Sequence, residues 1–421
     1  MSLSFFREYP MIRSARLLSL IPIALAFTAC FKSTNDSTAT KEPVYVAIGN
    51  SLTAGFQSGG LRADWQKQSY PVLLAQQMGI TNFQIPVVDS PGIGSAKGPD
   101  GSATTPLFLD SAGFPTYKPL GVAPNTLLSN FGYGQAYNNL AVPGATTLDI
   151  STAYNAASSQ SKDNAYFDAI IRGSVLNNTT MLHQAIGLKP DIMTMWVGSN
   201  DILGGITAGT IIMDTTVTPT AAYKAMMDAI FDSLLTKTTA HIFVANIPSI
   251  TSIPYVTTIP PVLFNPATFA VDTTKPLVPM LTDEANVKYV LLPALAAIKT
   301  GTGFPVAAGG NGKKLPANLT LTQAEVDIAN GLVDGYNAYL KAKTDANADR
   351  LTLVDVNALL NKLTAGQIDG LSGKFYLFDS AHTAFSLDGI HPNAKGYRQV
   401  ANLYIDAINS ALGKTYAKLT P

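Results

Sequence analysis

The residues best suited to do chemistry together are a serine, an aspartate and a histidine that lie far apart in the chain. Ser51 directly follows a short apolar run, and Asp388 precedes His391 by three residues. A serine hydroxyl is a poor nucleophile at neutral pH unless a neighbouring base takes its proton, and that base must itself be oriented. The Asp-Gly-Ile-His spacing lets the carboxylate fold back onto Nδ1 of the imidazole, which leaves Nε2 free. These three side chains are therefore candidates for acyl transfer.

Two further residues are candidates for stabilising a negative charge. Gly144 lies in a Pro-Gly turn, and Asn200 follows the apolar run 192–197. A tetrahedral intermediate needs hydrogen-bond donors for its oxygen, and we expect the N–H groups of Ser51 and Gly144 and the amide of Asn200 to supply them. Each motif alone has an ordinary structural explanation: a helix-capping serine, a tight turn, an Asx-turn, or an acidic turn with a helix-capping histidine. Their combination is what predicts a site.

The order of these motifs resembles that of a known family. Four residues match in order the signature blocks of the SGNH hydrolases, also called GDSL-like lipases and esterases: Ser51, Gly144, Asn200 and His391. The resemblance covers about residues 43–412 and implies ester hydrolysis through an acyl-enzyme, on a flavodoxin-like sheet. Asn50 stands where the family has the aspartate of its GDSL motif. Because that aspartate is not one of the four signature residues, we expect activity to remain.

The chain has four histidines, and none has a neighbour in a His-x-His or His-x-x-x-His spacing. The sequence therefore suggests no zinc site, and the proposed chemistry needs neither a metal nor a cofactor. We favour His391 over His382 as the base, because we expect no matching aspartate partner for His382.

Strands and helices alternate along the chain, which predicts a three-layer α/β fold with a doubly wound, mainly parallel sheet. Sites in such sheets gather at the carboxyl ends of the strands, where Ser51 and Asn200 are expected. The apolar runs predict strands at 44–48, 83–88, 192–197, 241–246 and 351–356. The 3.6-residue periodicity and the capping residues predict helices at about 71–78, 221–235, 322–342 and 393–412.

We expect residues 43–415 to form one hydrolase domain with insertions at about 89–136 and 250–318. Both insertions are rich in Gly, Pro and Thr, and such long excursions are often functional. The second is expected to carry one helix, at 283–298, and to act as a cap that helps to wall an acyl pocket. Whether this cap moves as a lid is left open by the sequence.

The first 30 residues have the pattern of a secretory signal. Arg13 and Arg16 precede an apolar run that ends shortly before Cys30, the only cysteine in the chain, and the run is short for a bilayer span. The cysteine resembles that of a bacterial lipobox, which implies acylation and a membrane-anchored lipoprotein of the cell envelope. The alternative is a plain signal peptide and a periplasmic or secreted protein. Residues 31–42 are polar and are expected to form a flexible tether.

The composition narrows the partners. The 421 residues include 28 basic and 28 acidic side chains, so there is no excess of positive charge for binding a nucleic acid. The leading hypothesis is hydrolysis of acyl lipids or small apolar esters. Removal of acetyl groups from a polysaccharide is the alternative with the same chemistry, and a non-catalytic surface-binding lipoprotein is the alternative without it. The oligomeric state is left open.

Overall fold

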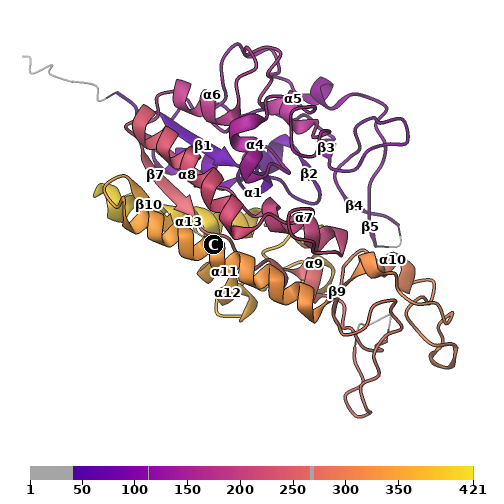
Figure 1. The fold of residues 1–421 in the computed structure, drawn as a ribbon. Coiled ribbons are helices and arrows are strands. Elements are labelled where there is room, and N and C mark those ends of the chain that lie inside the picture. Colours follow the sequence, from indigo (N-terminus) through magenta and orange to yellow (C-terminus); the bar gives the residue numbers. More distant parts are fainter. Residues whose placement is uncertain (1–40, 112, 266–269, 421) are drawn as a thin grey trace, which may run out of the picture. The chain divides into compact units, whose positions relative to one another are not determined.

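The computed structural model describes residues 41–111, 113–265 and 270–420 (Figure 1). The expected signal peptide, Cys30 and nearly all of the expected tether lie outside the described residues. Within them, four parallel strands form a sheet of order β1-β6-β7-β10, and no helix is long and apolar enough to cross a membrane. The strands are β1 (Tyr45–Gly49), β6 (Ile192–Trp196), β7 (His241–Ala245) and β10 (Leu351–Val354).

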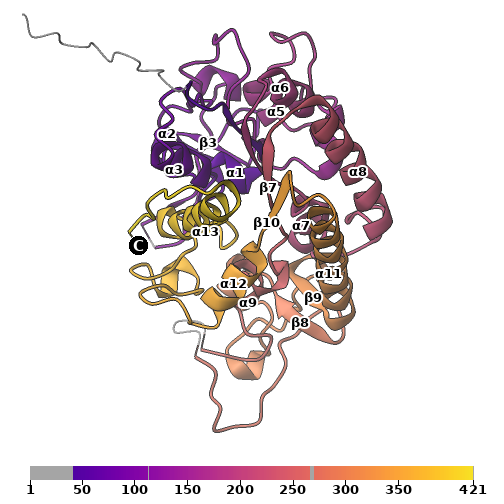
Figure 2. The same cartoon turned by 90° about the vertical axis from the view of Figure 1, so that its left-hand side faces the viewer.

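The sheet is buried on both faces, which explains why its strands have mostly apolar sequences without strict alternation. In β1, Val46 and Ile48 enter one hydrophobic core, while Tyr45 and Ala47 enter the other. Figure 2 shows β7 and β10 between α13 on one side and α8 and α11 on the other. The predicted three-layer α/β fold is therefore confirmed. The main covering helices are α3 (Tyr70–Gln77), α6 (Met181–Gly187), α8 (Thr220–Lys237), α11 (Gln323–Asp345) and α13 (Ala394–Leu412).

The strand predicted at 83–88 is wrong. Pro86 has no N–H to donate, and side-chain amides take the N–H groups around it: Asn130 Oδ1 accepts from Val87 N at 2.9 Å and Gln66 Oε1 accepts from Val88 N at 3.0 Å. The segment 138–142 lies against β1 instead. Backbone bonds of 2.8–3.1 Å join it to β1, so the chain leaves this edge of the sheet just before Gly144.

Helix capping follows the sequence closely. Thr322 and Glu325 form a capping box at the start of α11, and Asn393 caps α13 through the N–H groups of Lys395 and Gly396. Gly413 ends α13 with a φ of 60°, a conformation that glycine adopts without strain. The last helix is thus fixed at both ends, and the loop before it contains Asp388 and His391.

Small two-stranded sheets lie within or border the two segments predicted to be insertions. In the first, β4 (Phe108–Leu109) pairs with β5 (Pro115–Thr116), while β3 (Ile93–Gly94) pairs with β2 (Gly60–Leu61), which precedes the segment. The helix predicted at 283–298 is wrong in its first half, where β8 (Val287–Val290) pairs with β9 (Thr320–Thr322). Pro293 cannot lie inside a helix, and only the short α10 (Ala294–Ile298) follows it.

Candidate active site

Ser51 lies at the turn between β1 and the short helix α1 (Ser51–Ala54). Asn50, not Ser51, caps this helix: its Oδ1 accepts a hydrogen bond of 3.1 Å from Leu52 N. The turn requires glycine at position 49, because a Cβ there would lie 2.4 Å from Thr53 Oγ1 and 2.7 Å from the Trp196 carbonyl oxygen. The Ser51 hydroxyl is therefore not used in capping and is available for another contact.

That contact is with His391. Ser51 Oγ lies 2.8 Å from His391 Nε2, and His391 Nδ1 lies 2.9 Å from Asp388 Oδ2. The Ser51 and His391 residues are only 6% and 7% exposed, so water competes little for these bonds. The Phe56 ring packs against the imidazole with 4.7 Å between ring centroids. The structure thus brings together the serine, histidine and aspartate that the sequence singled out, across 340 residues of chain.

The carboxylate of Asp388 receives several donors. Its Oδ1 accepts from the N–H groups of Ile390 and His391, both at 2.9 Å, and its Oδ2 accepts from Gly59 N at 2.7 Å. Burial by itself would raise the pKa of Asp388, but the charge of His391 and the hydrogen bonds from His391 and Ile390 outweigh it and lower the pKa below its ordinary value. Asp388 is therefore ionised at neutral pH.

Ser386 of the same loop and Gly59 of another loop hold this aspartate, and neither carries a motif that the sequence analysis could have found. Ser386 Oγ donates to Asp388 Oδ1 at 3.2 Å and accepts from Ser58 N at 2.8 Å. Together with the Gly59 N–H, these contacts join the loop after α1 to the loop before α13. Two loops more than 300 residues apart in the chain thereby fix the carboxylate.

The three residues predicted to supply oxyanion donors line the same cavity: Ser51, Gly144 and Asn200. The Asn200 side-chain amide lies at the start of α7 (Asn200–Ala208). One of its hydrogens is donated to the Ala145 carbonyl at 2.8 Å, and its second hydrogen is available to another acceptor. Gly144 has a φ of 79°, a left-handed conformation suited to glycine. Within the described part of the chain, the N–H groups of Ser51 and Gly144 have no hydrogen-bond acceptor. The structure therefore brings the predicted oxyanion donors to the same place.

Asp201 ties the elements of these donors together. Its Oδ2 accepts from both the N–H and the hydroxyl of Thr147, each at 2.9 Å. Thr147 begins α4 (Thr147–Thr152), just after Gly144, while Asp201 follows Asn200 in α7. Burial raises the pKa of Asp201 to about 6, although the Thr147 bonds oppose this rise. This carboxylate links the loop of Gly144 to the helix of Asn200.

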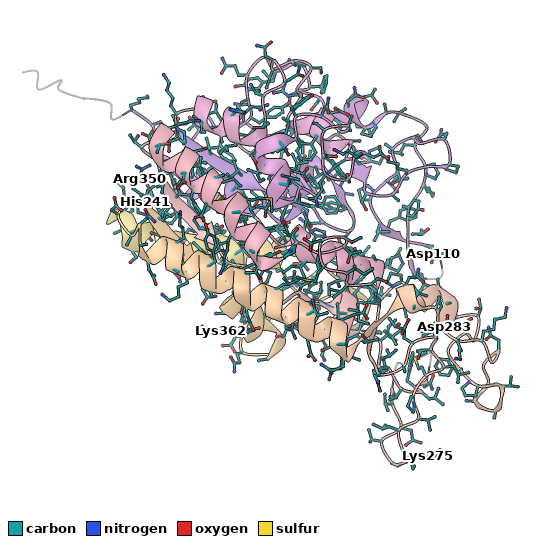
Figure 3. The ribbon with its side chains drawn as sticks, viewed as in Figure 1. Asp110, His241, Lys275, Asp283, Arg350 and Lys362 are labelled. Carbon is teal, nitrogen blue, oxygen red and sulfur yellow. The ribbon has the colours of Figure 1, made fainter. Side chains whose placement is uncertain are left out.

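The expectation that His382 lacks an aspartate partner is wrong. Asp379 precedes it by three residues, and Asp379 Oδ1 lies 2.7 Å from His382 Nδ1. The two Asp-His pairs differ in surroundings: the His382 side chain is 63% exposed, against 9% for His391. Spacing alone does not separate the two histidines. Figure 3 shows a third, His241, beside Arg350 at an end of the sheet.

The candidate site opens into a cavity of about 640 Å³. Its lining includes Ser51, Gly144, Asn200 and His391, together with several residues of the first insertion. A second cavity of about 600 Å³ shares Asp388 with it and is lined in part by α10 of the second insertion. Both insertions therefore contribute to cavities beside the site.

The comparison with known protein families identifies one family. Residues 45–404 match the family described as GDSL-like Lipase/Acylhydrolase, and no curated protein matches the sequence. Similar solved structures include an extracellular lipase from Streptomyces rimosus (13% identity over 87% of this chain and 98% of that chain, TM-score 0.36). An acetylxylan esterase from Geobacillus stearothermophilus shares 10% identity over 90% and 97% of the two chains, with a TM-score of 0.36.

An active-site mutant of a family two carbohydrate esterase from Clostridium thermocellum shares 9% identity, with 88% of this chain and 64% of that chain covered and a TM-score of 0.35. At these identities and TM-scores, the structural likenesses say nothing about the substrate of this chain. The family match is different, because it covers most of the sequence. The chain belongs to the GDSL-like lipase/acylhydrolase family and is a hydrolase of ester bonds.

Proposed function

We propose that the protein hydrolyses carboxylic esters through an acyl-enzyme on Ser51, with His391 as the base and Asp388 as the residue that orients it. One observation carries the proposal: an unbroken line of contacts runs from Asp388 Oδ2 through both imidazole nitrogens to Ser51 Oγ, with distances of 2.9 and 2.8 Å. This line ends at the wall of a cavity large enough for a substrate.

The reaction has two halves. Ser51 Oγ attacks the ester carbonyl carbon while its proton passes to His391 Nε2. The bond to the alcohol then breaks, the imidazolium gives its proton to the leaving oxygen, and the acyl group remains on Ser51. Water repeats these steps in the deacylation half, which releases the carboxylic acid and restores the serine hydroxyl.

The negative oxygen of each tetrahedral intermediate needs preorganised donors. We assign this role to the N–H groups of Ser51 and Gly144 and to the free amide hydrogen of Asn200. Loss of one such donor typically raises the activation free energy by about 3–4 kcal/mol. Because these groups are fixed before the substrate binds, they need no reorganisation during the reaction.

Covalent labelling tests this proposal directly. A fluorophosphonate bonds to an activated serine with loss of fluoride, so the intact mass of the protein should rise by one phosphonyl group. Peptide mapping should then find the adduct on Ser51. The Ser51→Ala variant is the control and should remain unlabelled and inactive. Absence of labelling in the folded wild-type protein, or an adduct on another residue, would refute the assignment of Ser51.

A further inference from the structure

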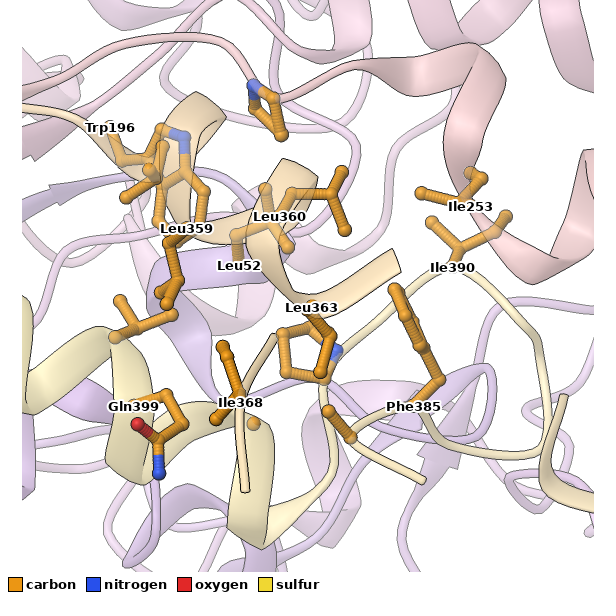
Figure 4. A pocket seen from close by; sticks show the side chains of 16 residues that line it. Leu52, Trp196, Ile253, Leu359, Leu360, Leu363, Ile368, Phe385, Ile390 and Gln399 are labelled. Atoms are coloured by element: carbon orange, nitrogen blue, oxygen red, sulfur yellow. The ribbon is translucent and has the colours of Figure 1, made fainter. Parts of the chain in front are cut away.

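An apolar chamber of about 80 Å³ lies beside helix α12 (Val356–Thr364) (Figure 4). Leu359, Leu360 and Leu363 of α12 line it, together with Ile368 and Phe385. Among its lining side chains, only Gln399 and the indole nitrogen of Trp196 are polar. Preformed apolar chambers of this kind bind apolar groups rather than water. We call it the distal chamber.

A smaller chamber of about 40 Å³ borders Ser51, Asn200 and His391. We call it the proximal chamber. The two chambers adjoin, because they have four lining residues in common: Leu52, Pro248, Ile253 and Ile390. Two unpartnered polar atoms at the proximal chamber, Asn50 Nδ2 and Ser199 Oγ, each have less than 1 Å² of accessible surface. The wall that a ligand meets is therefore apolar.

We propose that the proximal and distal chambers bind the acyl chain of the ester, and that the enzyme prefers medium-length acyl groups over acetyl. The inference rests on the proposed function, because it starts from an acyl carbon bonded to Ser51. An acetyl group has only one carbon beyond the carbonyl and does not reach the distal chamber. The 640 Å³ cavity, whose lining includes the charged residues Lys97, Asp163 and Asp168, then accommodates the alcohol part.

The hydrophobic effect sets the expected size of this preference. Each methylene removed from water should raise kcat/KM by about fourfold. We expect kcat/KM for p-nitrophenyl esters to increase by this factor with each added methylene, starting from acetate. The increase should stop once the chain fills the distal chamber.

Filling the distal chamber tests the inference. Leu359→Trp should lower the ratio of octanoate to acetate hydrolysis, measured as kcat/KM, by at least about tenfold. Lys362→Trp is the matched control, because Lys362 lies on the same helix but does not line the chamber. Its ratio should equal that of the wild type. Ile368→Trp fills the same chamber from the loop after α12 and serves if Leu359→Trp does not fold.

The outcomes separate this inference from the proposed function. If both filling variants keep the wild-type ratio, or if acetate esters and acetylated xylan are the best substrates, the chambers do not bind the acyl chain. If Ser51→Ala still hydrolyses both esters, the proposed function itself fails. Loss of both activities in Ser51→Ala with an unchanged ratio in the filling variants overturns only the acyl-chain inference.

A separate observation concerns the peptide between Pro143 and Gly144. Asn164 Nδ2 donates to the Pro143 carbonyl at 2.8 Å, and Asn164 Oδ1 accepts from Tyr166 N at 3.1 Å, which fixes the amide in one orientation. In a trans peptide the C=O and N–H bonds point in opposite directions. The Asn164 contact therefore directs the Gly144 N–H away from Asn164.

We infer that Asn164 is a positioning residue for the oxyanion site. It holds the Pro143 carbonyl, while Asn200 holds the Ala145 carbonyl at 2.8 Å. Two amide side chains thus brace the backbone on either side of Gly144. Without Asn164, the Gly144 N–H would no longer be held in place for the tetrahedral oxygen. The inference also rests on the proposed function.

The Asn164→Ala variant tests this role. We expect kcat to fall about tenfold with little change in KM, which is less than the loss of a whole donor. Affinity for a boronic acid, which forms a tetrahedral adduct on the serine, should fall by a similar factor. Asn155→Ala is the matched control: Asn155 accepts from Ser158 N at 2.8 Å in the same segment, and no hydrogen bond in the described chain joins it to residues 143–145.

Two results would overturn the role of Asn164. One is a wild-type kcat in Asn164→Ala. The other is an equal loss of affinity for substrate and boronic acid, which indicates general loosening of the segment rather than loss of transition-state stabilisation. Activity that survives in Ser51→Ala would instead overturn the proposed function.

Discussion

Replacing Asp388 with asparagine should lower kcat for short esters by about 10⁴-fold while leaving the fold intact. Asp388 Oδ2 accepts from Gly59 N and from the imidazole Nδ1. In the asparagine variant an NH₂ group replaces this oxygen, and it cannot accept a hydrogen bond from either nitrogen. The imidazole then carries its proton on Nε2, where it cannot receive the proton of Ser51. Steady-state kinetics on p-nitrophenyl esters measures the effect.

The chain offers a matched control for this prediction. Asp379 also lies three residues before a histidine and contacts it at 2.7 Å, but it does not line the cavity at Ser51. Asp379→Asn should therefore retain wild-type kcat. Comparable losses in both variants would mean that Asp388 acts only through general stability, and a fully active Asp388→Asn would remove it from the mechanism.

Replacing Arg172 with methionine should lower the free energy of unfolding by about 3 kcal/mol. The Arg172 residue is 0% exposed. Its guanidinium donates to the carbonyls of Phe131, Tyr133 and Gln135 and lies 4.1 Å from the centroid of the Tyr137 ring. Methionine keeps much of the volume but supplies no donors, so these carbonyls lose their partners. Urea unfolding gives the difference.

Two further variants make this result specific. Arg172→Lys keeps the charge but lacks the planar fork that reaches several carbonyls, so it should lose about half as much stability. Arg398→Met removes an arginine whose one hydrogen bond in the described chain is 3.4 Å long, and should change stability by less than about 0.5 kcal/mol. Equal effects of Arg172→Met and Arg398→Met would contradict the assigned role of Arg172.

The central fold was predictable because burial on two faces leaves a strong local signal. The runs at 192–197 and 241–246 are mostly apolar and contain β6 and β7, and capping residues fixed the ends of the last helices. The run at 83–88 gave the same signal without forming a strand. Its backbone N–H groups are taken by amides of distant residues, which no local pattern reveals.

The site shows a similar division. Ser51, Gly144, Asn200 and His391 were predicted because their order is specific, even though each is ambiguous alone. The contacts of Gly59, Ser386 and Asn164 were not predicted. Hydrogen bonds between side chains and the backbone of distant loops follow no fixed spacing in the sequence. His382 marks the limit of such rules, since it has the spacing of His391 but lies at the surface.

The position of the proposed base along the chain has a consequence for biosynthesis. The hydroxyl belongs to the short helix α1 that follows the first strand, whereas the imidazole precedes the last helix, α13, which packs on α3 through the stacked rings of Tyr70 and Tyr404. A growing polypeptide therefore holds its nucleophile long before the partner that activates it. Under the proposed mechanism, hydrolysis begins only once synthesis has passed residue 391 and the final helix has docked, so unfinished chains are inert toward esters.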